Sequence, residues 1–139
     1  MSIFAAGGLL LAAPSVVLAE DAVGLWETDE SHMEIYECGD RVCGRIAALD
    51  DPLDEDGNER LDKNNPDPAL RSRPIIGMDI IVGLVRTGKK KWEDGTIYDP
   101  RDGKTYKCVI KLKRDGSLKV RGYIGTPLLG KTVVWTRVE

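Results

Sequence analysis

The sequence predicts a single all-β domain in which eight strands form an up-and-down antiparallel meander that closes into a barrel. Three observations support this prediction. Helical periodicity is almost absent after the N-terminal segment, short segments alternate polar and apolar residues, and turn residues separate those segments. The 139 residues, 42% of them hydrophobic, suffice for the core of one domain and hardly for two. Closing eight strands removes exposed edges and leaves room for side chains or one small ligand.

The clearest pair of strands flanks the turn Arg114-Asp115-Gly116, where Gly116 can adopt the positive φ that tight connections need. Apolar and polar residues alternate on both sides of this turn. Extending the same pattern along the chain, we expect strands near residues 24–29, 32–38, 42–49, 76–86, 91–98, 104–113, 117–124 and 129–138.

Composition and motifs argue against several functions. The formal net charge of −3 and the lack of an aromatic-basic motif disfavour a nucleic-acid binder. His32 is the one histidine, which excludes a histidine-rich metal enzyme. The sequence contains no G-x-S-x-G elbow and no glycine-rich phosphate loop. We therefore expect neither an enzyme nor a bound cofactor or metal.

Residues 1–19 have the pattern of a removable secretory signal. They carry no charged side chain, Pro14 ends the apolar stretch, and Val17-Leu18-Ala19 places small residues before a cleavage site. The lack of Lys or Arg departs from the usual pattern, and an uncleaved anchor is the alternative because about 20 apolar residues can span a bilayer. Cleavage would leave one barrel domain, residues 20–139, in the periplasm or secreted, and not an integral membrane protein.

Cys38 and Cys43 flank a four-residue segment between two predicted strands. A hairpin with a four-residue loop would place Cys38 opposite Cys43 and Ile35 opposite Ile46, within bridging reach. In an exported protein this pair predicts a disulfide. Cys108 alternates with apolar neighbours, so we expect it to be a buried thiol of the core.

A long acidic loop is expected from about residue 50 to residue 74. A helical turn near residues 68–71, capped by Asp67, is compatible with its sequence. The run Asp51–Asp62 resembles a calcium loop around Gly57, but Pro52 and Lys63 occupy the first and twelfth ligand positions. The prediction is therefore a solvated acidic loop.

Charge is divided unevenly along the chain. Residues 20–62 contain 15 acidic and 3 basic residues, whereas residues 63–139 contain 8 acidic and 17 basic residues. Within the basic half, alternation predicts one outward face that carries Lys107, Lys111, Lys113, Lys119 and Arg121. A plain solvated face is the first interpretation, and contact with an anionic lipid or glycan is the alternative.

Two features resemble the lipocalin–calycin signature: Gly24-Leu25-Trp26 in the first strand and Arg137 in the last. The resemblance implies that Trp26 and Arg137 close one end of the barrel, with a cation on an indole face.

A wider set of motifs resembles an exported bacterial family, domain of unknown function 2147, over nearly all of residues 22–138. The resemblance implies a lipocalin-like fold and the same cysteine pair, and it implies no particular reaction or ligand. The motifs are Cys38-Gly39, Cys43-Gly44, Asn65-Pro66-Asp67, Leu70-Arg71-Ser72-Arg73-Pro74, Gly77, Trp92, Gly95, Tyr98-Asp99-Pro100, Asp102-Gly103-Lys104-Thr105-Tyr106, Arg121-Gly122-Tyr123 and Trp135-Thr136-Arg137.

Arg71 and Arg73 have no evident structural reason in the sequence, so we predict that they contact an anionic group. Their pairing with the acidic run of the same chain is the alternative.

Two functions remain open. The first is a binding protein for a small apolar or amphipathic ligand held inside the barrel. The second is a cell-envelope module that acts through its surface, in particular the acidic loop and the basic hairpin. The expected partners are thus a small hydrophobic ligand or an envelope component, and not a nucleic acid. Strand alternation and the fold analogy predict the ligand-lining side chains: Met78, Ile80, Val82, Tyr106, Cys108, Ile110 and Val120.

Overall fold

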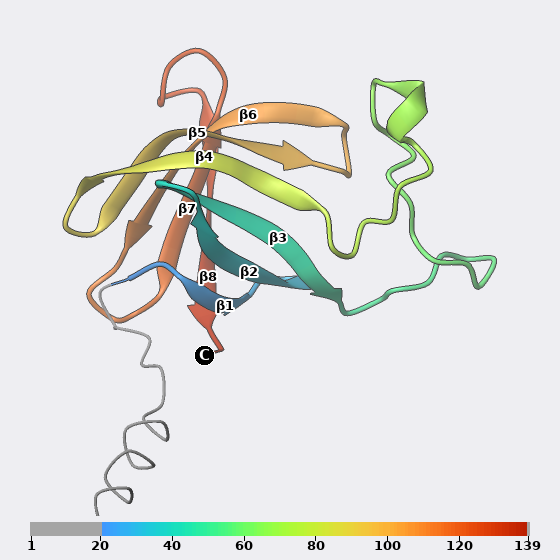
Figure 1. The fold of residues 1–139 in the computed structure, drawn as a ribbon, viewed down its shortest axis with the longest axis horizontal. Helices are drawn as coiled ribbons and strands as arrows, with labels where there is room; N and C mark the ends of the chain where they lie inside the picture. Colours follow the sequence, from blue (N-terminus) through green and yellow to red (C-terminus); the bar gives the residue numbers. More distant parts are fainter. Residues whose placement is uncertain (1–20, 139) are drawn as a thin grey trace, which may run out of the picture.

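The computed structural model describes residues 21–138, which form eight strands and one short 3-10 helix (Figure 1). The predicted signal, residues 1–19, lies outside the described residues. The elements are β1 (Gly24–Glu27), β2 (Ser31–Cys38), β3 (Arg41–Leu49), η1 (Pro68–Leu70), β4 (Asp79–Gly88), β5 (Lys91–Asp99), β6 (Lys104–Leu112), β7 (Leu118–Tyr123) and β8 (Gly130–Arg137).

Each strand pairs antiparallel with its neighbours in sequence, and β1 pairs with β8 to close the barrel. The closing ladder joins Trp26 to Arg137 and Glu27 to Thr136. The predicted eight-stranded antiparallel barrel is therefore confirmed. Helix η1 is also confirmed: the side chain of Asp67 accepts a hydrogen bond from the backbone N–H of Ala69 at its N-terminus.

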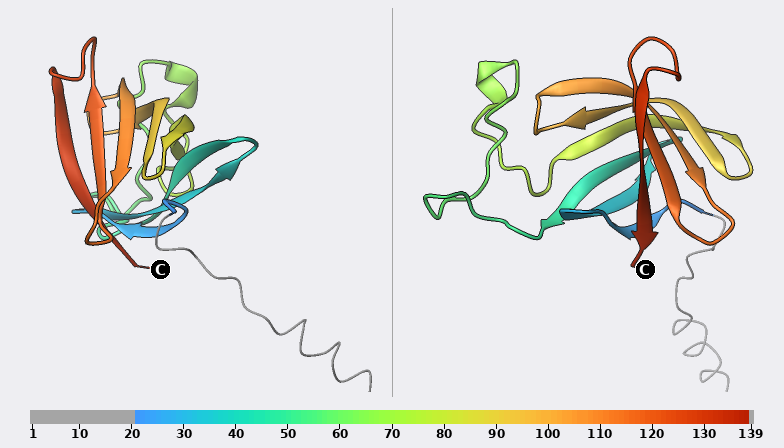
Figure 2. Two further views of the ribbon diagram at one scale, coloured as in Figure 1. Left: turned by 90° about the vertical axis from the view of Figure 1, so that its left-hand side faces the viewer. Right: turned by 180° about the vertical axis from the view of Figure 1, so that it is seen from behind.

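Because the strands alternate in direction, the connections fall at two ends of the barrel. We call the end with residues 28–30, 50–78, 100–103 and 124–129 the loop end. The other end is called the terminal end. It contains residues 39–40, 89–90 and 113–117, and residues 21–23 lie against β8 there. Residues 50–78 project sideways from the ends of β3 and β4 in Figure 1 and in the right-hand view of Figure 2.

The interior of the barrel is filled by apolar side chains from all eight strands. Trp26, Trp92 and Met33 are the largest that are fully buried. The core cluster consists of Ala22, Trp26, Met33, Ile35, Ile46, Met78, Ile80, Ile81, Leu84, Trp92, Cys108, Ile110, Leu112, Leu118, Val120 and Trp135. Burial of these side chains is the main favourable contribution to folding.

Alternation along β4 is broken, and this corrects one prediction. Two irregularities in the ladder with β3 each insert an extra residue into β4, on either side of Ile81. Ile81 and Leu84 therefore point into the core, whereas Val82 is 50% exposed on the outer face. The prediction that Val82 lines the barrel interior is wrong, because it assumed an unbroken period of two.

The β2–β3 hairpin contains the predicted disulfide between Cys38 and Cys43, with Cα atoms 5.8 Å apart. Its register differs from the expected one. The turn has two residues, Gly39 and Asp40, so that Cys38 lies opposite Arg41 and Cys43 lies opposite Tyr36. The bridge is therefore diagonal. Gly39 has a φ of 69°, the left-handed conformation that favours glycine in such turns.

Cys108 is buried in the core, and desolvation raises the pKa of its thiol to about 12. We expect a thiol reagent at neutral pH to leave the native protein unmodified, because a buried, protonated thiol is a poor nucleophile. After denaturation without reductant the reagent should titrate one thiol per chain. A count of three would contradict the disulfide, and rapid modification of the native protein would contradict the burial of Cys108.

Gly95 on β5 lies against the bulged part of β4. A Cβ atom added there would lie 2.6 Å from the carbonyl oxygen of Val82 and 2.8 Å from the backbone nitrogen of Leu84. These atoms belong to backbone and cannot move aside as a flexible side chain would.

We predict that Gly95→Ala destabilises the protein by roughly 2 kcal/mol or more, as overpacking does. Gly88→Ala is the matched control, because a Cβ at Gly88 would meet one side-chain atom at 3.5 Å, an ordinary contact. Urea unfolding of both variants measures the difference. Equal stabilities would show that β4 and β5 can separate at this point without cost.

Candidate functional site

The terminal end of the barrel is closed by Trp26 and Arg137, as predicted. The guanidinium carbon of Arg137 lies 4.3 Å from the centre of the Trp26 ring. Arg137 also donates hydrogen bonds to the carbonyl oxygens of Asp21 and Val23, and the indole N–H of Trp26 donates to the carbonyl of Ala22. These contacts fix residues 21–23 across the terminal end.

Six of the seven predicted lining residues belong to the inner side of the barrel, but they pack against one another. The five that are buried in the core cluster are Met78, Ile80, Cys108, Ile110 and Val120. Tyr106 is half-buried and its hydroxyl donates a hydrogen bond to Asp102 in the β5–β6 turn at the loop end. Val82 points outward. These side chains fill the interior instead of surrounding an open lumen.

The most prominent polar feature of the loop end is the carboxylate of Asp62, which is fully buried. Asn65 donates to its Oδ2 atom at 2.8 Å, Arg73 to the same oxygen at 3.1 Å, and Tyr98 to Oδ1 at 2.7 Å. The backbone N–H of Asp62 also donates to the carbonyl of Arg73. Asp62 was expected to lie in a solvated loop, and that expectation is wrong for this residue.

Burial alone would raise the pKa of Asp62, but the hydrogen bonds from Asn65, Tyr98 and Arg73 outweigh it and hold the pKa below its ordinary value of 3.8. For Tyr98, burial and the hydrogen bond to Asp62 raise the pKa to about 12. Both groups therefore keep one protonation state near neutral pH. A carboxylate with a lowered pKa and both oxygens engaged is a poor general base. Its contacts tie the long connection to β5.

The positions of Arg71 and Arg73 favour the alternative given for them, pairing within the chain. Arg73 forms an ion pair with Asp62. The Nε atom of Arg71 donates to the carbonyl oxygen of Asn65 at 2.7 Å. That either arginine also contacts an external anionic group stays a prediction. Arg73 is nevertheless only partly satisfied, because its Nε atom is buried and has no hydrogen-bond partner in the described part of the chain.

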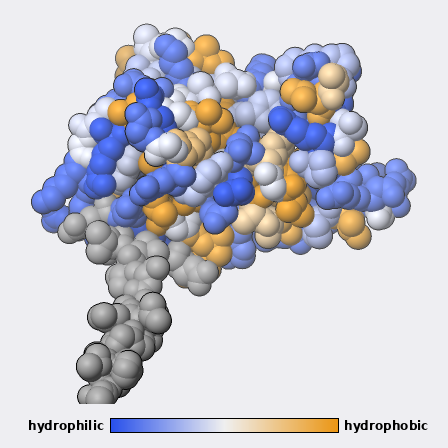
Figure 3. Space-filling model, in the orientation of Figure 1, coloured by the Kyte–Doolittle hydropathy of each residue, from blue (hydrophilic) through white to orange (hydrophobic). Residues whose placement is uncertain are grey.

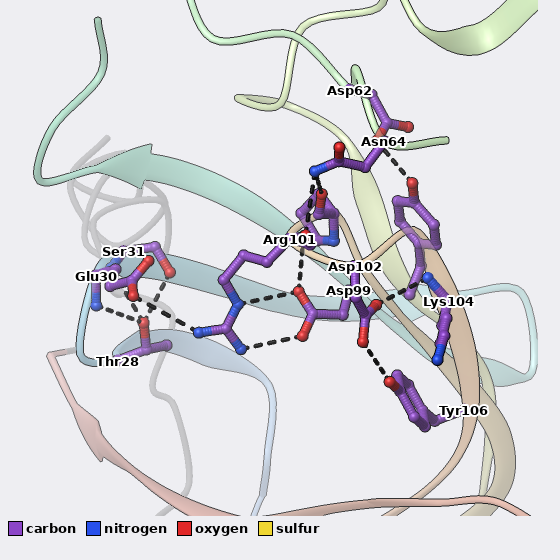
Figure 4. Close-up of polar contacts among 12 residues, drawn as sticks. Thr28, Glu30, Ser31, Asp62, Asn64, Asp99, Arg101, Asp102, Lys104 and Tyr106 are labelled. Carbon is purple, nitrogen blue, oxygen red and sulfur yellow. Dashed lines mark hydrogen bonds and ion pairs between the residues drawn. The ribbon is translucent and has the colours of Figure 1, made fainter. Parts of the chain in front are cut away.

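A second set of contacts ties the long connection to the β5–β6 turn (Figure 4). The side chain of Asn64 donates hydrogen bonds to the carbonyl oxygens of Pro100 and Arg101, both at 3.1 Å. Gly103 allows this approach, since a Cβ atom there would lie 2.0 Å from the carbonyl oxygen of Asn64. Gly103 also has a φ of 71°. The turn therefore needs glycine for two separate reasons.

Arg101 extends these contacts across the mouth of the barrel (Figure 4). It forms two hydrogen bonds with Asp99, at 3.0 and 3.1 Å, and its Nη1 atom lies 3.6 Å from a carboxylate oxygen of Glu30. Glu30 belongs to the β1–β2 turn, which lies on the opposite side of the ring of eight strands from the β5–β6 turn. The pair therefore crosses the route by which a ligand would enter the interior from the loop end.

One hollow lies outside the barrel, between the long connection and the start of β4. It is shallow and largely open to solvent, with a volume of about 420 Å³. Arg73 and Pro74 form one side, Met78 belongs to the core behind it, and Asp79 accepts a hydrogen bond from Tyr36 at its edge. Ile76 and Gly77 complete the lining. Figure 3 shows apolar residues gathered between the barrel and the projecting connection.

The second hollow, of about 200 Å³, lies at the terminal end beside residues 21–23 and the β2–β3 turn. Trp92 lies at its inner side, with the guanidinium of Arg86 4.8 Å from the centre of the ring. It is smaller than most ligand sites, so the hollow beside Met78 is the better candidate. Among residues 21–138, no group of three or more His, Cys, Asp or Glu side chains is placed to hold a metal ion.

The residues around Asp62 stand out in the sequence, but the sequence does not show that they contact one another. The motifs Asn65-Pro66-Asp67 and Tyr98-Asp99-Pro100 belong to the set that carries the family resemblance. Nothing in the sequence pairs Tyr98 with Asp62, because the two residues are 36 positions apart. The sequence also does not distinguish Asp62 from the other acidic residues of the long loop.

The fold and the closed terminal end define a lipocalin-like barrel. The structure is similar to protein HP1028 from the human pathogen Helicobacter pylori, which is described as belonging to the lipocalin family, with a TM-score of 0.75 and 28% sequence identity. The match covers 86% of this chain and 84% of that one. Residues 24–137 match the family described as uncharacterized protein conserved in bacteria, DUF2147, and the chain belongs to that family. The resemblance inferred from the motifs is thus confirmed.

No curated protein matches the chain. Within the described residues, no helix is long and apolar enough to cross a bilayer.

We predict that Asp62→Asn destabilises the protein by about 2 kcal/mol, because the amide removes the negative charge that pairs with Arg73 and replaces one of the two acceptor oxygens with an NH2 donor. Asp51→Asn is the control. The side chain of Asp51 is 81% exposed and pairs with Arg60, so its loss should cost less than about 1 kcal/mol. Denaturant unfolding measures both values.

Comparison of the wild type with the Asp62→Asn variant also tests the pKa of Asp62. Because this pKa is lower in the folded protein than in the unfolded chain, stability is complete above the ordinary value of 3.8 and falls as the pH drops through the lowered value. The Asp62→Asn variant should lack that part of the acid dependence. An identical acid dependence in wild type and variant would contradict the assignment.

Proposed function

We propose that the chain is an exported, lipocalin-like binding protein that holds a small amphipathic ligand in the hollow beside Met78. It acts by binding and not by catalysis. The observation that carries this proposal is the hollow itself, which has an apolar inner side and charged groups at its edge. Such a lining suits a ligand with an apolar body and a charged or polar head.

The lining residues divide the hollow into two chemical parts. Ile76 and Pro74 offer apolar surface to a hydrocarbon chain, above the buried side chain of Met78. Arg73 offers a cation that is partly used by Asp62, and its side chain remains 40% exposed. A carboxylate or phosphate group on the ligand would complete the hydrogen bonding of Arg73.

This location differs from the interior site that the strand pattern predicted. The core side chains occupy the interior, and the contacts of Arg101 with Asp99 and Glu30 cross the mouth. A ligand of any size would have to displace packed side chains in order to enter the barrel. The hollow between the connection and β4 requires no such displacement.

Two features support the export that the proposal includes. The disulfide between Cys38 and Cys43 is typical of proteins from oxidising compartments such as the bacterial periplasm. The pattern of residues 1–19 is that of a secretory signal. A second candidate function, an envelope module that acts through its surface, is favoured by the exposed leucines of the loop between β7 and β8.

Dodecanoate is a suitable probe for the proposed site, because it joins a carboxylate to an apolar chain. We expect Ile76→Asp to weaken its binding at least tenfold, since a carboxylate in the apolar part of the hollow repels the probe and remains hydrated. Isothermal titration calorimetry on the wild type and the variant measures the two affinities.

Val82→Asp is the matched control, because Val82 is an exposed aliphatic residue on β4 and lies outside the hollow. It should bind dodecanoate as the wild type does. Equal affinities for the wild type and both variants would place the site elsewhere, and no binding of dodecanoate or of lipid co-purified from the envelope would overturn the proposal.

A further inference from the structure

The loop between β7 and β8 carries three aliphatic side chains that the barrel does not cover. Leu128 is 89% exposed, Leu129 is 70% exposed and Ile124 is 57% exposed. A single exposed leucine is ordinary on a protein surface. Three such residues within six positions of one protruding loop form an apolar tip, and we call residues 124–129 the apolar loop. Exposed apolar groups of this kind mark surfaces that bind a partner or a membrane.

The apolar loop is held in a defined conformation. The side chain of Arg121 donates from Nε to the carbonyl oxygen of Pro127 at 2.8 Å and from Nη1 to the hydroxyl of Thr132 at 2.7 Å. Within the loop, the backbone N–H of Leu129 donates to the carbonyl of Thr126 at 3.0 Å. The same clamp that orders the loop therefore keeps Leu128 and Leu129 directed away from the core.

The strands that carry this loop are strongly basic. Residues 104–138 contain nine Lys or Arg and one acidic residue, Asp115. Lys107 lies opposite Tyr123, next to the base of the apolar loop, and Lys131 lies opposite Gly122. Neither lysine forms an ion pair within residues 21–138.

Distance decides which lysines can act together with the apolar loop. Lys119 is four residues before Tyr123, or roughly 13 Å along the strand. That distance exceeds the Debye length of about 8 Å at physiological ionic strength. Lys107 and Lys131, which lie within one residue pair of the loop, are close enough to act together with it. Lys104 also lies at the loop end of β6.

Two acidic groups near this end are already engaged by other partners. Asp99 is bound mainly by Arg101, with a weaker electrostatic attraction to Lys131, and Asp102 accepts hydrogen bonds from Tyr106 and from the backbone N–H of Lys104. The acidic run 50–62 belongs to the connection after β3, away from β7 and β8 in the ring of strands.

We propose that the apolar loop and its flanking lysines dock the protein onto a bilayer that contains anionic phospholipid. Leu128 and Leu129 enter the boundary between headgroups and acyl chains, and Lys107 and Lys131 contact the phosphates. A convex apolar tip flanked by cations is complementary to such a surface, where apolar and anionic layers are adjacent. The membrane would hold the loop end while leaving the hollow beside Met78 free.

Introduced tryptophan provides a direct test, because Trp26, Trp92 and Trp135 are all buried. In a Leu128→Trp variant the added indole is the exposed one. We expect vesicles of phosphatidylglycerol and phosphatidylcholine with brominated acyl chains to quench its emission, and vesicles of phosphatidylcholine alone to quench it much less. Quenching of a single introduced indole reports membrane contact at position 128 alone. Vesicle binding through other parts of the chain, such as residues 1–20, would therefore not be mistaken for contact by the apolar loop.

Val82→Trp is the matched control, because Val82 is 50% exposed on β4, four strands away from β8 in the ring. Its emission should not be quenched. In sedimentation with the same anionic vesicles, Leu128→Ser combined with Leu129→Ser should reduce the partition coefficient at least tenfold. Lys107→Gln combined with Lys131→Gln should reduce it severalfold and weaken its salt dependence.

Three results would overturn the proposal. The first is an unquenched Leu128→Trp emission in anionic vesicles, and the second is equal quenching of the Leu128→Trp and Val82→Trp variants. The third is concentration-dependent dimerisation that the serine variant abolishes without any vesicle binding, which would assign the apolar loop to a second copy of the chain. None of these results bears on dodecanoate binding, so the two proposals can fail separately.

Discussion

The ordered shape of the long connection depends on one buried carboxylate. Asp62 accepts hydrogen bonds from Asn65 and Arg73 of its own connection and from Tyr98 of β5. A buried carboxylate without partners would be strongly destabilising. The three donors compensate the cost of burying Asp62, and they also fix where its side chain lies. Because Arg73 and Pro74 form one side of the hollow beside Met78, the geometry of the proposed site follows from this interaction.

The strands and their order could be predicted because each follows from local alternation and turn residues. Prediction failed where the ladder departs from strict alternation. The two extra residues in β4 turned Val82 outward, and the two-residue turn at Gly39 shifted the hairpin register while leaving the disulfide intact. The site was largely hidden, because the burial of Asp62 depends on a hydrogen bond to Tyr98, which no local pattern encodes.

Most of the features that suggest function lie at the loop end, where acidic and basic residues belong to different segments. The connection after β3 is acidic and encloses the hollow, whereas β6 to β8 are basic and carry the apolar loop. The uneven charge along the sequence is therefore expressed as two distinct surfaces of one domain. The packed interior supports both surfaces by holding the strands in a fixed arrangement. In both proposals the barrel acts as a scaffold and its connections carry the contacts.

The separation of Asp62 and Tyr98 also has a consequence for the order of folding. Seven of the eight strand pairings join neighbours in sequence, whereas the contact between these residues closes a segment of 36 positions. Loop closure costs more entropy as the segment lengthens, so hairpins form first and long-range contacts follow. The long connection can dock only after β5 is in place to present Tyr98. The hollow beside Met78 is thus among the last parts of the molecule to acquire its shape, and the first that a weakened barrel would lose.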